Sequence, residues 1–124
     1  MKIPEYIAKE EVRRVCRNLK IRDWTKLKNA RVLPKEAKMI IRAVNTEKMK
    51  FDPEEFRKGM EVELEHGLRF KDANVTNNHP ILTGMIVLAH LKESLDYYKL
   101  LEVAELKLPV SLDPRGRHAP PASH

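Results

Sequence analysis

The sequence predicts an all-α fold, a small bundle of about four main helices with a long loop before the last one. Apolar residues recur at helical spacing in four segments, which begin near residues 8, 34, 53 and 80. Asp52 followed by Pro53 is typical of a helix start. With 124 residues, 42% of them hydrophobic, the chain is long enough for one core, which we place in residues 1–107.

Two short helices are expected in the first third of the chain. The first spans about three turns after residue 8, and the second is opened by Pro34 and ends near Asn45. Between them, Asp23 caps a short helical piece that contains Trp24. The apolar residues predicted to face the core from the two helices are Val12, Val15, Cys16, Leu19, Ala37, Ile40, Ile41 and Val44.

A longer helix is predicted to begin at Asp52 and to stop at Gly67, with Glu55 closing a capping box. Projection at about 100° per residue places Glu63 and His66 on the inward side of this helix. Their spacing of three residues keeps them on one side, while the other charged residues of the helix point to solvent.

The last helix is expected to run from about residue 80 to 107, with a bend near Ser94. Its apolar stripe is predicted to contain Leu82, Ile86, Ala89, Leu100, Leu101 and Ala104. His90, Glu93 and Tyr97 fall inside this stripe. The following segment, residues 108–124, is rich in proline and is predicted to be a flexible tail.

Antiparallel packing of the two long helices would bring their polar residues together. Glu63 would meet Glu93, and His66 would meet His90. Two carboxylates in an apolar interior need a cation, a shared proton or a histidinium partner. The pattern therefore predicts a non-haem transition metal, iron, manganese or zinc, with Glu63, His66, His90 and Glu93 as ligands and Tyr97 beside them as a cofactor-binding residue.

Two other interpretations use the same residues. Glu63 paired with His90, and Glu93 paired with His66, would form a metal-free polar core to which Tyr97 could donate. An acid/base pair without metal is the catalytic interpretation. Two His with one or two Glu also fit a site completed by a second subunit, which makes a homodimer one of the expected assemblies.

The net charge of +6 is unevenly distributed. Residues 1–50 contain fifteen Lys and Arg against six Asp and Glu, a net charge of +9, whereas the remainder has nine against twelve. The alternative function is therefore a binding module for nucleic acid or an acidic partner, in which the Glu and His residues are only structural. Its contact residues would be Arg13, Arg17, Lys20, Lys35, Lys38 and Arg42.

Composition favours a cytoplasmic protein. No apolar run is long enough for a membrane span, and the first residues lack the pattern of a signal peptide. Cys16 is the only cysteine, which excludes an internal disulfide and cysteine-based zinc motifs. No membrane partner is expected.

Three sequence segments, ELEHG, NVTNNHPILTG and AHLKESLDYY, resemble an uncharacterised family of small prokaryotic helical proteins. That family pairs an ELEHG-type helix end with an HLKE-x-x-DYY-type helix and is a domain of unknown function. The resemblance covers roughly Phe51 to Glu105. It implies that the polar residues of both helices belong to one unit, and it implies no activity.

Overall fold

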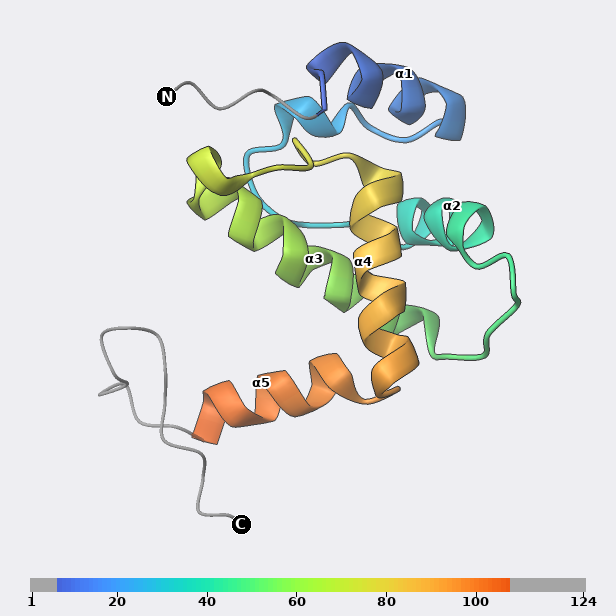
Figure 1. Cartoon of the computed structure of the whole chain (residues 1–124), viewed down its shortest axis with the longest axis vertical. Helices are drawn as coiled ribbons and strands as arrows, with labels where there is room; N and C mark the ends of the chain where they lie inside the picture. Colours follow the sequence, from blue (N-terminus) through green and yellow to red (C-terminus); the bar gives the residue numbers. More distant parts are fainter. Residues whose placement is uncertain (1–6, 108–124) are drawn as a thin grey trace.

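The computed structural model describes residues 7–107, and every regular element in that range is helical (Figure 1). The α-helices are α1 (Lys9–Leu19), α2 (Pro34–Val44), α3 (Pro53–Arg69), α4 (Pro80–Glu93) and α5 (Tyr97–Lys107), and the short 3₁₀ turns are η1 (Trp24–Lys26) and η2 (Lys71–Ala73). The all-α prediction is confirmed. Within this range no helix has the length and apolar character needed to cross a membrane. The predicted tail lies outside the described residues.

The local signals placed most helix starts correctly. Asp52 caps α3 by accepting a hydrogen bond from the backbone N–H of Glu54, and Pro53 occupies the first helical position. Asp23 caps η1 in the same way through Thr25. The predicted stop at Gly67 is wrong, because α3 continues to Arg69. Gly67 instead lies under the side chain of Asn74, which a Cβ atom at Gly67 would meet at 2.8 Å.

The core lies where α2, α3 and α4 pack against one another, with α1 and η1 closing one end (Figure 1). Its fully buried side chains include Trp24, Ile40, Phe56, Met60, Leu64, Val87 and Leu91. The absence of a side chain at Gly84 brings α4 close to α2, since a Cβ atom there would lie 2.6 Å from Ile40. Two of these helices, α3 and α4, carry the polar residues Glu63, His66, His90 and Glu93.

The segment predicted to be the last helix forms two helices, because the helical conformation is interrupted at Ser94. Ser94 has extended backbone angles (φ −157°, ψ 121°), and α5 leaves the end of α4 at a sharp corner (Figure 1). The predicted apolar stripe is also wrong for α4, where Ile86 and Ala89 are exposed. The residues of α4 that are buried are Pro80, Thr83, Gly84, Val87, Leu88 and Leu91.

Tyr98 anchors α5 to α3. Its side chain is 4% exposed and lies directly over Gly59, where an added Cβ atom would meet the ring at 2.5 Å. A glycine at this position of α3 therefore makes room for an aromatic ring from α5. This contact fixes where the residues of α5 stand relative to α3.

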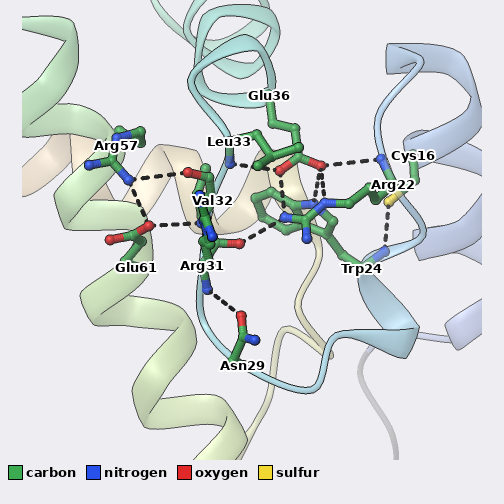
Figure 2. Close-up of polar contacts among 10 residues, drawn as sticks. All are labelled: Cys16, Arg22, Trp24, Asn29, Arg31, Val32, Leu33, Glu36, Arg57 and Glu61. Carbon is green, nitrogen blue, oxygen red and sulfur yellow. Dashed lines mark hydrogen bonds and ion pairs between the residues drawn. The ribbon is translucent and has the colours of Figure 1, made fainter.

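A buried carboxylate organises the segment between α1 and α2 (Figure 2). Glu36 is fully buried, and its Oε2 accepts hydrogen bonds from Arg22 Nε at 2.9 Å and Trp24 Nε1 at 3.2 Å. Its Oε1 accepts from a second guanidinium nitrogen of Arg22 at 2.7 Å and from the backbone N–H of Leu33 at 3.0 Å. Burial raises the pKa of Glu36, but these donors outweigh burial and hold the pKa below its usual value.

Replacing Glu36 with Gln should lower the free energy of unfolding by about 2–3 kcal/mol at neutral pH. Arg22 loses its counter-ion, and the cost is at the lower end for a broken buried pair because Arg22 is partly exposed to water. Since the pKa of Glu36 is lower in the folded chain, its stabilisation is complete above the unfolded-state pKa of about 4.3 and is lost as the pH falls through the folded-state pKa.

Urea unfolding across the acid range measures both effects, with Glu65→Gln, an exposed change on α3, as the control. Equal stability of the two variants at neutral pH would contradict the structural role of Glu36.

Candidate functional site

Glu63 and His90 come together where α3, α4 and α5 meet. Glu63 Oε2 lies 3.8 Å from His90 Nε2, and it accepts a hydrogen bond of 3.0 Å from the hydroxyl of Tyr98. The side chains of Glu63 and His90 are 19% and 31% exposed, so the pair is only partly shielded from water. Burial, and then the nearby charge of Glu63, raise the pKa of Tyr98, which keeps its hydroxyl a hydrogen-bond donor.

Two tyrosines enclose the imidazole of His90. Tyr97 stacks on it with a centroid separation of 4.3 Å and an interplanar angle of 9°, while Tyr98 meets it edge-on at 5.9 Å. The hydroxyl that bonds the carboxylate is therefore that of Tyr98, which the sequence analysis missed. The paired tyrosines of DYY were the available signal, but the break at Ser94 decides which of them faces α3.

His66 and Glu93 do not take part in the contact between Glu63 and His90. Both side chains are exposed, so their predicted inward orientation is wrong, and Glu63 lies against His90 rather than in the predicted contact with Glu93. His66 and Glu63 instead line a shallow pocket of about 380 Å³ beside Phe70, Val75 and Ile86. Across residues 7–107, no group of three or more His, Cys, Asp or Glu side chains is arranged to hold a metal ion.

The predicted basic residues differ in their partners. Arg13 lies 3.6 Å from Asp23 and 4.0 Å from Glu10, so its charge is partly satisfied within the chain. The other five are exposed, and in the part of the chain that the structure describes none of them forms an ion pair: Arg17, Lys20, Lys35, Lys38 and Arg42. On α2 the three cations follow one another at spacings of three and four residues, on the side of the helix opposite Ala37 and Ile40.

A model of a protein family matches most of the chain. DUF5661, described as a protein of unknown function, matches residues 12–107. The expectation of an uncharacterised family is confirmed, and the match extends into the basic first third of the chain. No curated protein and no solved structure matches the chain.

Removing the hydroxyl of Tyr98 tests the polar contact at this junction. Tyr98→Phe should lower the free energy of unfolding by about 1 kcal/mol, because Glu63 loses a buried donor. The raised pKa of Tyr98 means that its stabilisation is complete below the unfolded-state value of about 10 and is lost as the pH rises above it. Chemical denaturation, together with an ultraviolet titration of phenolate, measures both quantities.

Tyr97→Phe is the matched control, because the ring of Tyr97 stacks on His90 while its hydroxyl bonds no carboxylate in the described residues. A larger loss for Tyr97→Phe than for Tyr98→Phe would show that the assignment of the hydrogen bond is incorrect.

Proposed function

Because the chain belongs to DUF5661, a family without an assigned activity, we propose a function from the geometry: the protein binds nucleic acid through the exposed cations of α1 and α2. We call this set of residues the basic face. It consists of Arg17, Lys20, Lys35, Lys38 and Arg42, together with the partly paired Arg13.

The observation that carries the proposal is the lack of acidic partners for the five central cations within the described residues. Four other basic residues, Arg14, Arg22, Arg57 and Lys92, each contact a carboxylate, whereas exposed lysines such as Lys58 and Lys99 form no ion pair within the described residues. Unpaired cations in an array attract a polyanion and release its condensed counter-ions on binding. The charge of +9 in residues 1–50 supports the same conclusion.

The composition of the face favours contact with phosphates over contact with bases. Exposed aromatic rings that could stack on bases do not accompany the cations of α2, because this helix contains no aromatic residue. Lys and Arg on a helix surface reach the sugar–phosphate backbone, which carries no direct sequence information. We therefore propose binding that is weakly sequence-dependent and strongly salt-dependent.

Fluorescence anisotropy with a labelled DNA or RNA duplex tests the proposal over a series of salt concentrations. The variant Lys35→Glu, Lys38→Glu, Arg42→Glu should bind at least about tenfold more weakly, and the slope of log K against log salt should decrease by about 1 for each phosphate that the variant no longer neutralises. The control Lys58→Glu, Lys71→Glu, Lys99→Glu changes the net charge equally at exposed positions outside the basic face. Equal losses of affinity in the two variants, or no binding at low salt, would rule out this face.

Metal binding is the second candidate, and the closeness of Glu63 to His90 favours it. A carboxylate and an imidazole 3.8 Å apart can both bind one ion of iron, manganese or zinc. Among the four predicted ligands, Glu63 and His90 alone form an ion-pair contact within the described residues, so further ligands would have to come from water, from a movement of His66, or from a second copy of the chain. A homodimer therefore remains part of this hypothesis.

Elemental analysis of tag-free protein purified without chelator tests the metal hypothesis. We expect near-stoichiometric metal in the wild type and its loss in Glu63→Ala, His90→Ala, because both changes remove ligand atoms. The control Glu65→Ala removes an exposed carboxylate of the same helix outside the pair. Wild-type protein that is metal-free and cannot be loaded would leave Glu63 and His90 as a structural pair.

A further inference from the structure

Glu55 of α3 is a buried residue, one of whose carboxylate oxygens accepts no hydrogen bond from the described residues. The residue is 8% exposed, and Oε1 is the one buried side-chain nitrogen or oxygen atom in residues 7–107 without a hydrogen bond. Burying a charged acceptor without a donor is costly, so native proteins rarely do it without a reason. The missing donor therefore suggests that a ligand with a hydrogen-bond donor binds beside Glu55.

Glu55 is one of the residues that line a pocket of about 250 Å³ between α3 and α5. Glu102 and Glu105 of α5 line the same pocket, and Val62, Leu101 and the ring of Tyr98 supply its apolar wall. We call this pocket the α3–α5 groove. It combines three carboxylates with an aromatic ring and two aliphatic side chains.

We propose that the α3–α5 groove binds an organic cation, a primary ammonium or guanidinium group on an aliphatic stem, whose N–H groups donate to Glu55. The two exposed carboxylates at Glu102 and Glu105 attract the positive charge. The apolar wall suits the stem, and the ring of Tyr98 is the kind of surface on which a cation is stabilised. An organic cation fits better than a metal ion, since the described residues contain no group of three carboxylates or other ligands arranged around a common point.

Two lysines at the rim, Lys58 and Lys99, are the competing explanation. Both line the groove and are exposed, and neither forms an ion pair with Glu55. The three carboxylates outnumber the two lysines, so the groove keeps a net negative charge. If either lysine paired with Glu55 in solution, the free protein would need no ligand there, and the experiment must distinguish this case.

Two probes distinguish the sources of such a cation. Spermidine represents a free polyamine, and the capped peptide Ala-Ala-Arg-Ala-Ala represents a side chain of a protein partner. Because the chain carries a net charge of +6, non-specific attraction of either probe is unfavourable. Titration followed by amide chemical shifts reports both affinity and place of binding.

We expect at least one probe to bind, with the largest shifts in α3 and α5, and Glu55→Gln to weaken that binding by about tenfold or more. The control Glu65→Gln, an exposed change on the same helix and outside the groove, should bind as the wild type does. Binding of spermidine alone identifies a polyamine, and binding of the peptide identifies a protein partner. Failure of both probes, or equal binding by Glu55→Gln, would overturn the proposal.

The thermal stability of the free protein tests the lysine explanation independently of any ligand. Glu55→Gln should leave the melting temperature unchanged or raised, because it removes an unpaired buried charge. Lys58→Ala and Lys99→Ala should have little effect. A clear decrease for Glu55→Gln together with one of the lysine variants would show an internal pair and contradict the proposal. The outcome is independent of nucleic-acid binding, because no residue of the groove belongs to the basic face.

Discussion

The carboxylate of Glu36 is the interaction on which the placement of the first third of the chain depends. It holds Arg22, Trp24 and Leu33 at one point (Figure 2). Trp24 is in turn bonded through its backbone to Cys16 of α1 and to Asn78 in the loop before α4. One buried charge therefore connects α1, α2 and the loop before α4. The connection runs through the segment around Trp24, which has little regular structure. Such a charge specifies an arrangement because few alternatives supply as many donors.

The comparison of Glu36 with Glu55 shows how far local sequence determines the hydrogen bonds of a side chain. Both follow a helix-opening proline by two residues, at the third position of α2 and α3. Glu36 reaches back to the N–H of Leu33, as a capping glutamate should, whereas the expected capping bond of Glu55 is absent and that prediction was wrong. The difference comes from tertiary contacts, since Arg22 and Trp24 bond Glu36 while Glu55 lines a pocket with residues of α5.

Sequence patterns predicted the fold class and the helix starts because capping residues and prolines act within one turn of the chain. They failed for α4, whose sequence from Pro80 to Leu91 is apolar on nearly all sides, so that its periodicity does not define an inner face. Glu93 is exposed because it lies on the same outer side of α4 as Ile86 and Ala89. The break at Ser94 then rotated α5 relative to α4, so that Tyr98 rather than Tyr97 bonds Glu63. Half of the predicted cluster, Glu63 with His90, was recovered because both lie at the junction of the helices.

Tyr98 connects the two polar regions of the second half of the molecule. Its hydroxyl bonds Glu63, its ring lies on Gly59, and the same ring forms part of the α3–α5 groove beside Glu55. Glu55, Gly59 and Glu63 are spaced by four residues, so they follow one another along a single side of α3. A cation bound at Glu55 would contact the ring whose hydroxyl determines the environment of Glu63 and His90. Tyr98 therefore contributes to the packing of both the groove and the carboxylate–imidazole pair.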